Sequence, residues 1–393
     1  MKNKAGITLL VAAALAVAAV AAATASTDGA GKAGATSAPT AGAAAAASCS
    51  RTMSIAYAGP ITGPAASLGA QQLNWVKFAV AAWNKAATPK FKIVQGDTQL
   101  PKVEEAIKVA KQLASDKRVW GVVGPAGSQE VADSAKSYKA GGLAFISGSA
   151  TRTSLTNGKL RGYFFRVVPN DDVQGPSVGK YMVETLKTKH VYIIDDQETY
   201  SQGLADTVQK YLKAKGVTAD RDSVSQSASD FSSLIAKISS DVTLVYLPWQ
   251  LSAKAQLFGQ QLKSAGKSAK LFGSDGLFDP STFKIAGSYV SFFPVNAKAA
   301  QAVAYAKAHK GNGDFFGAPS SVAAGVMMKA IRAACADGKI TRAEVRRKVA
   351  ATTIPKAQSI LGFAIRFTRN GDVNPSKFGI YQIQSDGTYK PVG

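Results

Sequence analysis

Short apolar segments that suit β-strands alternate with amphipathic segments that suit helices along most of this chain. The strand candidates are rich in Val, Ile and aromatic residues and end in Gly, Pro or Ser. Between them, residues 102–114 place their apolar side chains on one stripe with Lys and Glu opposite, and 202–214 and 231–239 behave likewise. The alternation predicts an α/β fold with parallel sheets covered by helices on both faces. The strand candidates are residues 53–58, 91–94, 119–123, 143–147, 191–194, 242–247 and 271–273.

This alternation runs twice, once before about residue 168 and once after it. The folded part starts near Arg51 and has about 340 residues, which is too long for one typical hydrophobic core. We therefore expect two domains. Ligands of parallel α/β sheets bind outside the carboxyl ends of the strands, so the loops that follow the strand candidates are where a binding site is expected.

The first residues have the composition of an export signal. Lys2 and Lys4 precede an uninterrupted run of small apolar residues, 6–23, and small residues at 23 and 25 suit a signal peptidase. We predict a signal peptide over residues 1–25 and export to the periplasm or the outer face of the cell envelope. A membrane anchor is the alternative, but an Ala-rich run of this length is at the weak limit for a stable span.

The next segment, residues 26–50, is almost entirely Ala, Gly, Ser and Thr up to Cys49. Such a composition buries too little side chain to offset its ordering entropy, so it predicts a flexible linker. Cys49 and Cys335 are the two cysteines, and an oxidising compartment allows them to pair. A single pair carries no spacing pattern, so a disulfide, two separate thiols and lipidation of Cys49 all stay open.

The chain has 47 Lys and Arg against 25 Asp and Glu, a formal net charge of +22. On an exported protein this charge predicts a solvated basic surface that faces anionic envelope polymers or lipid headgroups. The densest basic run, residues 342–348, is expected to be the exposed face of a helix. It has no interleaved aromatic residues, so we expect no nucleic-acid partner.

Reactive groups that an enzyme would need are scarce. The two histidines, His190 and His309, are expected to be structural or surface residues, and Asp195-Asp196 to cap a loop. The sequence has no G-x-S-x-G elbow, no Cys/His cluster with metal-ligand spacing, no G-x-G-x-x-G after a strand and no Walker motif. We therefore predict a binding protein with no catalytic residue, metal or cofactor.

Small hydroxyl and glycine residues concentrate in two loops that follow neighbouring strand candidates. In 124–129, Ser128 is a predicted N-cap, and its hydroxyl and the free amides of the first helical turn suit an anion. Residues 147–151, with Ser149 and Thr151, follow the next strand. Together the loops could hold a carboxylate with neutral donors, although each alone is equally well an ordinary cap or turn.

Eight short motifs occur in a fixed order along the folded part. They are Gly59-Pro60-Ile61-Thr62-Gly63-Pro64 with Gly69, Val122-Val123-Gly124-Pro125, Ser147-Gly148-Ser149-Ala150-Thr151, Phe165-Arg166, Asp172-Val173-Gln174-Gly175-Pro176, Tyr200-Ser201-Gln202-Gly203-Leu204-Ala205, Asp230-Phe231-Ser232 and Gly371-Asp372. In this order they resemble the type I periplasmic binding proteins of the leucine/isoleucine/valine-binding family, over residues 52–390. Each motif is weak alone, but their common order is specific.

This resemblance implies a ligand held between two lobes and assigns a role to individual residues. Ser128 and Thr151, with the backbone at Ser149, would hold an α-carboxylate. Asp275 would pair with an α-ammonium, and Tyr200 would pack over the ligand. A zwitterion leaving water needs a partner for each charge. The chain departs from the family at Leu68, where an aromatic residue is frequent, at the loop 248–251, where we expect Trp249 to line the pocket, and at 321–325, which lacks the usual aromatic residue.

The resemblance also implies the architecture and the role. We expect two Rossmann-like lobes joined by three crossings, residues 51–168 with 295–361 and residues 169–294 with 362–393. The protein would be a monomer that captures a branched-chain, related hydrophobic or aromatic amino acid and hands it to an ABC transporter permease. The alternatives are a ligand-sensing ectodomain, a binder of another small carboxylate or amide, and an enzyme on this fold.

Overall fold

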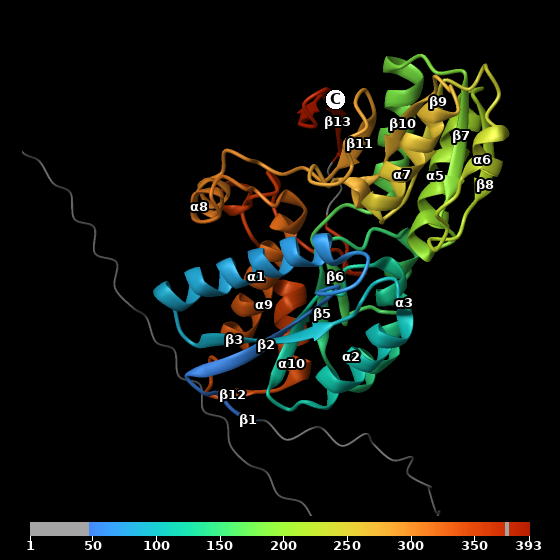
Figure 1. Ribbon diagram of the computed structural model, residues 1–393. Helices are drawn as coiled ribbons and strands as arrows, with labels where there is room; N and C mark the ends of the chain where they lie inside the picture. The colour runs from blue at the N-terminus through green and yellow to red at the C-terminus, as the bar shows by residue number, and fades with distance from the viewer. Residues whose placement is uncertain (1–46, 374–376) are drawn as a thin grey trace, which may run out of the picture. The chain divides into compact units, whose positions relative to one another are not determined.

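Two β-sheets, each with helices on both faces, organise the part of the chain that the structure describes (Figure 1). The structure, a computed structural model, describes residues 47–373 and 377–393. The predicted signal peptide and residues 26–46 of the predicted linker lie outside the described residues. The strands of the first sheet are β2 (Thr52–Gly59), β3 (Lys90–Asp97), β4 (Val119–Val123), β5 (Ala144–Ser147) and β6 (Phe164–Arg166). Those of the second are β7 (His190–Asp195), β8 (Thr218–Ser223), β9 (Leu244–Leu247), β10 (Lys270–Gly273), β11 (Tyr289–Phe292), β13 (Gly379–Ile383) and β14 (Tyr389–Pro391).

The two sheets repeat one strand order. The first runs β3-β2-β4-β5-β6 and is parallel throughout. The second begins β8-β7-β9-β10-β11, also parallel, and adds β13 and β14 as antiparallel strands at one edge. Both parallel parts follow the order 2-1-3-4-5 of doubly wound folds. The predicted fold class, two α/β lobes with parallel central sheets, is confirmed, with the antiparallel edge of the second sheet as an addition.

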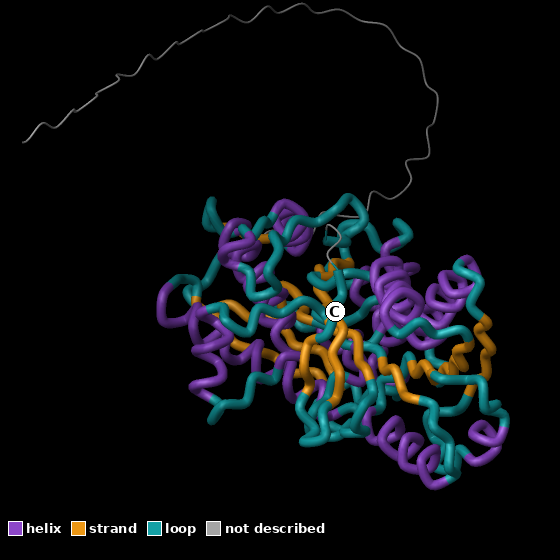
Figure 2. The backbone as a smooth tube through the Cα atoms, turned by 90° about the horizontal axis from the view of Figure 1, so that it is seen from above, coloured by secondary structure: helices purple, strands orange, loops and turns teal. Residues whose placement is uncertain are grey.

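Alternate residues of the first sheet enter two separate cores, because successive side chains of a strand point to opposite faces. Ile55 and Tyr57 pack with helices α1, α9 and α10. Ala56 and Ala58 pack under α2 and α3 on the other face. Figure 2 shows the strands enclosed by helices in this way. The helices of this part are α1 (Ala66–Ala86), α2 (Val103–Ser115), α3 (Ser128–Ala140), α8 (Ala300–Ala308), α9 (Ala318–Ala334) and α10 (Arg342–Ala351).

The second sheet is layered in the same way. Val191 and Ile193 pack with the helices α4 and α5, whereas Tyr192 and Ile194 pack with α6 and α7. The helix predicted over 231–239 is too long: α6 is a helix of five residues that ends at Ala236. The helices of this part are α4 (Asp171–Lys180), α5 (Thr199–Ala214), α6 (Ser232–Ala236) and α7 (Ser252–Ser264). Within residues 47–373 and 377–393, no helix is both long and apolar enough to cross a bilayer.

The chain passes from one sheet to the other three times, after β6, after β11 and before β13. Ile365 and Val373 belong to the core that contains Ile55 and Tyr57. These contacts favour a third crossing after Val373, whereas the sequence placed it at 361–362. We propose that the first lobe comprises 51–168 with 295–373 and the second lobe 169–294 with 377–393, and we use these names below.

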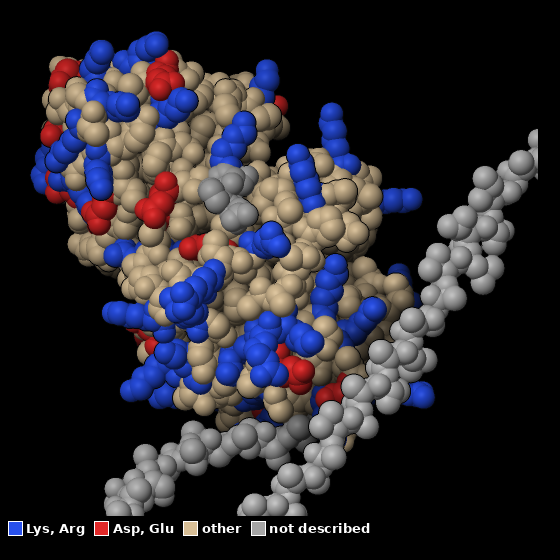
Figure 3. Space-filling model, turned by 180° about the vertical axis from the view of Figure 1, so that it is seen from behind, with Lys and Arg blue, Asp and Glu red and all other residues tan. Residues whose placement is uncertain are grey.

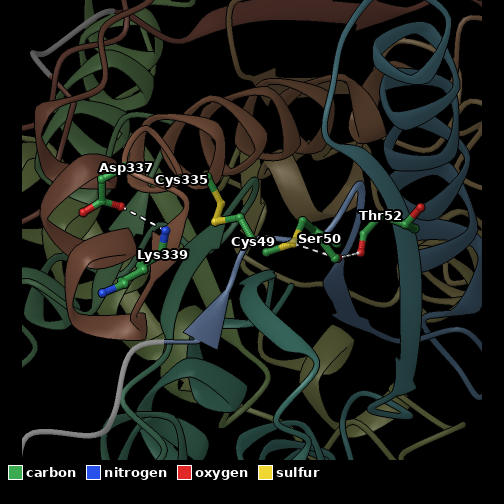
Figure 4. The surroundings of a disulfide bond; sticks show 7 residues. Cys49, Ser50, Thr52, Cys335, Asp337 and Lys339 are labelled. Atoms are coloured by element: carbon green, nitrogen blue, oxygen red, sulfur yellow. Dashed lines mark hydrogen bonds between the residues drawn. A yellow bond between two sulfur atoms is a disulfide. The ribbon is translucent and has the colours of Figure 1, made fainter.

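A disulfide joins Cys49 to Cys335 at the end of α9 (Figure 4). Beside it, β1 (Ala47–Ser48) pairs with β12 (Lys339–Ile340), so the last residues of the predicted linker are attached to the first lobe. The Cys49 amide also donates to the Gly338 carbonyl over 2.9 Å. Of the options that the sequence left open, the structure contains the disulfide.

The basic run on α10 is only partly an exposed face. Arg347 is exposed, but Arg342 is partly buried and its guanidinium donates to carbonyls at the ends of two helices. It donates to Ala114 and Gly141 over 2.7 Å each, and also to Asp116 and Val119. The Ala114 and Gly141 oxygens lie at the C-terminal ends of α2 and α3, where carbonyls have no partner inside the helix and a cation also suits the helix dipole. The prediction of an exposed basic helix face is therefore wrong for Arg342.

We expect Arg342→Met to lower the free energy of unfolding by about 2–3 kcal/mol, because it keeps the apolar stem and removes four hydrogen bonds to carbonyls. Urea denaturation of the variant and of the wild type measures the difference. Arg347→Met on the same helix is the matched control and should change the stability by less than about 0.5 kcal/mol. Equal effects of the two variants would contradict the capping role of Arg342.

Candidate functional site

A narrow pocket of about 20 Å³, room for about one water molecule, lies where the carboxyl ends of strands from both sheets meet. A larger ligand needs the two lobes to move apart at this place. The two lobes touch beside it, where the Gln129 side-chain amide donates to the Gln250 side-chain oxygen over 2.9 Å. The first lobe contributes Pro60, Leu68, Leu100, Ala126, Gly127, Ser149 and Phe316 to the lining, and the second lobe contributes Tyr200, Gln250, Asp275 and Gly276.

Asp275 is the charged residue of this lining. It follows β10 at the start of a 3-10 turn, and only 2 % of it is exposed. One carboxylate oxygen accepts from the Tyr200 hydroxyl over 2.7 Å and from the Gln174 amide over 2.6 Å. Burial raises the pKa of Asp275 to about 6, although these hydrogen bonds oppose the shift. Among the described residues, no Lys, Arg or His forms an ion pair with Asp275.

A second buried carboxylate, Asp171, lies near Asp275. It is the first residue of α4, and 1 % of it is exposed. Burial raises its pKa to about 7, and the negative charge of Asp275 contributes to the shift. The neighbouring Thr151 hydroxyl opposes this shift, and beyond each other neither the Asp171 carboxylate nor this hydroxyl has a hydrogen-bond partner among the described residues. Two buried carboxylates close together are costly unless a cation compensates them.

The loop with Ser149 and Thr151 is held in place by its own side chains and by Arg166. The Ser147 hydroxyl donates to the Pro125 carbonyl over 2.6 Å, and the Ser149 hydroxyl donates to the Ala126 carbonyl over 2.8 Å. Arg166 donates to the carbonyls of Ala150 and Arg152 and forms a 2.5 Å ion pair with Asp372. This ion pair brings together two motifs that are far apart in sequence, and Arg166 connects them to the loop.

Ser128 has a different position from the one predicted. Gly127 is the N-cap of α3, and its amide donates to the Glu130 side chain over 2.7 Å. Ser128 is the first helical residue, and its hydroxyl accepts from the amide of Arg152 over 3.2 Å. Its hydroxyl therefore joins the two predicted carboxylate-binding loops, and Gly127 lines the pocket in its place.

Trp249 was predicted to line the pocket, and this prediction is wrong. Its indole nitrogen donates to the Ile194 carbonyl over 2.7 Å, and its ring packs against Phe231 and Phe258 in the core of the second lobe. The next residue, Gln250, lines the pocket instead. The predicted loop does reach the pocket, but the residue that lines it is one position later.

The apolar part of the lining comes from Leu68, Leu100 and Phe316. Leu68 lies on the first turns of α1, at a position that the sequence singled out. Phe316 was not predicted, because its ring comes from the turn before α9 and not from residues 321–325, which the resemblance singled out. Of the predicted binding residues, the structure brings Leu68, Ser149, Tyr200 and Asp275 together at the pocket and places Ser128, Thr151 and Trp249 behind it.

Two lobes of equal strand order around a small pocket define the class of two-lobed solute-binding folds. A family model described as "Periplasmic binding protein" matches residues 52–388, so the chain belongs to the periplasmic binding protein family. Its relatives place it among the type I members of the leucine/isoleucine/valine-binding group, as the resemblance implied. This family consists of solute-binding proteins, and membership implies a location outside the cytoplasm.

One such relative is the leucine-, isoleucine-, valine-, threonine- and alanine-binding protein of Pseudomonas aeruginosa, 28 % identical over 87 % of this chain and 92 % of the relative. Among solved structures, the leucine binding protein LivK of Thermotoga maritima has a TM-score of 0.78 at 19 % identity, over 87 % of this chain and 98 % of the other. The substrate binding protein LivJ of Streptococcus pneumoniae, solved with isoleucine, has a TM-score of 0.74 at 22 % identity, over 87 % and 99 %.

Proposed function

We propose that the protein captures an amino acid with an apolar side chain between its lobes and delivers it to an ABC transporter permease. The observation that carries this proposal is Asp275, a buried carboxylate that lines the pocket and forms no ion pair within the described part of the chain. An ammonium group in the pocket would give it the missing partner, and the nearby Asp171 would add to the attraction.

The part of the lining that comes from the first lobe suits the carboxylate and the side chain of such a ligand. Gly127 in the lining is the N-cap of α3, so the backbone amides of the first helical turn are available for a carboxylate. Leu68, Leu100 and Phe316 offer apolar contacts for the side chain of such a ligand. The relatives named for leucine, isoleucine and valine support the same ligand class.

The test compares a zwitterion with analogues that lack one of its charges. Isothermal titration calorimetry of L-leucine and L-phenylalanine should show at least one ligand that binds in the micromolar range or tighter. For that side chain, the amine without a carboxylate and the acid without an ammonium should each bind at least about tenfold more weakly, since each leaves a buried polar group unpaired.

An acid that binds as tightly as the amino acid would contradict the ammonium site and favour a carrier of simple carboxylates. Transport and sensing are separated by a different measurement. Deletion of the protein should abolish uptake of the radiolabelled ligand by cells that retain the permease. Normal uptake with an altered transcriptional response to the ligand would instead favour a sensing role.

A further inference from the structure

The positive charge of the folded chain is concentrated in one lobe. The first lobe contains 29 Lys and Arg against 10 Asp and Glu, whereas the second lobe contains 15 against 14. The lobes therefore differ in net charge by about an order of magnitude, +19 against +1. In the view of Figure 3, blue side chains dominate the lower part of the molecule, whereas blue and red are mixed in the upper part. A general solubility role does not require such an asymmetry.

Six of these cations, all exposed, form what we call the basic pole. They are Arg118, Lys139, Lys159, Arg161, Lys339 and Arg347. The Lys139 ammonium donates to the Lys159 carbonyl over 3.0 Å and lies 5.7 Å from the centre of the Tyr163 ring. Arg346, next to Arg347, lies 4.3 Å from the centre of the same ring and donates to the Gly142 carbonyl. Arg342, three residues after Lys339, donates to the Asp116 carbonyl beside Arg118. The six cations thus lie on neighbouring segments.

Few acidic groups neutralise this face. Asp116 is held by Arg118 in a 2.8 Å ion pair, and it is the only acid that pairs with a member of the basic pole among the described residues. Asp337 accepts from the backbone amide of Lys339, and Glu344 is partly buried on α10. A large excess of positive charge is therefore left facing solvent.

The basic pole lies at the opposite edge of the sheet from the pocket. Arg118, Lys139, Lys159 and Arg161 shortly precede the starts of β4, β5 and β6, whereas the pocket lies beyond the carboxyl ends of the strands. The described chain also begins here, because Ser48 of β1 pairs with Lys339 of β12 and the disulfide attaches the same segment to α9. A partner at this pole would leave the ligand cleft open.

We propose that the basic pole holds the protein against a membrane surface of anionic lipid headgroups. The six cations come from five separate segments, a spread that suits a broad surface of phosphates better than a single polymer strand in a groove. Each Lys or Arg near such a surface contributes about 1 kcal/mol, and salt weakens the attraction. The choice of a membrane over a soluble polyanion rests on the proposed function: a protein held by this pole stays near the permease with its cleft open for loading, and it turns over to deliver the ligand.

The experiment measures co-sedimentation of the purified exported protein with vesicles. Vesicles of phosphatidylcholine with about 30 % phosphatidylglycerol should retain the protein at about 50 mM salt and release it at about 500 mM, and pure phosphatidylcholine should not retain it. The variant with Lys139→Glu, Arg161→Glu and Arg347→Glu should lose at least about tenfold in partition coefficient. The control with Lys210→Glu, Lys213→Glu and Lys263→Glu, exposed on the second lobe, should lose less than about threefold. A variant with Lys139→Gln, Arg161→Gln and Arg347→Gln should also lose retention. It replaces the Glu variant in the test if the charge reversal unfolds the first lobe.

Equal losses in the pole variant and the control would overturn the proposal, because net charge alone would then explain the retention. So would no retention of the wild type, or retention by dextran sulfate beads but not by anionic vesicles. Amino-acid affinity, measured by calorimetry, should be the same in the wild type and in all of these variants. A wild type that is retained but binds no amino acid would overturn the proposed function and leave the basic pole supported.

Discussion

Asp275→Asn should weaken the binding of a zwitterionic ligand by about 1.5–3 kcal/mol, roughly ten- to a hundredfold in Kd. The substitution keeps the shape of the side chain and an oxygen that can accept from Tyr200 and Gln174, but it removes the charge that would face the ammonium. Isothermal titration calorimetry with the tightest amino acid measures the change. The amine-free acid should lose no affinity in the same variant.

The matched control is Asp172→Asn, which changes an exposed carboxylate beside Asp171. Its Kd should stay within about twofold of the wild type, since an exposed charge is strongly screened. Unchanged affinity in Asp275→Asn would show that the ligand's ammonium has another partner. Asp171 would then be the candidate, because it is the other buried carboxylate near the pocket.

The same substitution should stabilise the ligand-free protein at neutral pH. Burial raises the pKa of Asp275 from its ordinary value of 3.8 to about 6 in the folded state, so the folded protein binds this proton more tightly than the unfolded chain. The stability that this proton confers is complete below pH 4 and is lost as the pH rises through 6. An Asn side chain does not ionise, so the variant keeps this stability as the pH rises. Its free energy of unfolding at pH 7.5 should exceed that of the wild type by about 1–3 kcal/mol.

Urea denaturation at pH 4.5 and 7.5 checks this sign, because the advantage of the variant should shrink towards the lower pH. A variant that binds poorly and is also less stable than the wild type at pH 7.5 would indicate damage to the fold instead of loss of an ammonium partner. The combination of weaker binding with higher stability is what a functional buried charge predicts.

The sequence predicted those parts of the fold that have strong local patterns. β2, β4, β7 and β9 are apolar runs bounded by turn residues, and the structure has a strand at each of them. β8 was missed because its residues Thr218–Ser223 are mostly polar, as an edge strand permits, and β6 because it has only three residues. The antiparallel edge of β13 and β14 depends on pairing with β11, about 90 residues earlier, which no local pattern reveals.

The candidate site was predictable at the level of loops but less so at the level of side chains. Asp275 follows β10 and Tyr200 lies in the first turn of α5 after β7, on the side of the sheet where such folds bind ligands, and their proposed roles came from the family resemblance. The choice between Trp249 and Gln250 depends on which way a loop residue points, and that is decided by packing against Phe231 and Phe258. Asp171 was missed because its significance comes from its burial and from its proximity to Asp275, neither of which is visible in sequence.

Removal of the disulfide by Cys49→Ser with Cys335→Ser should lower the free energy of unfolding by about 3–5 kcal/mol. The bond joins residues 286 positions apart, so its loss frees a very long loop in the unfolded chain. Urea denaturation of the double variant and of the oxidised wild type measures this difference, and the reduced wild type should match the variant. A difference below about 0.5 kcal/mol would show that the bond only attaches the preceding segment to the first lobe. Ligand affinity should not change, because Cys49 and Cys335 lie at the edge of the sheet away from the pocket.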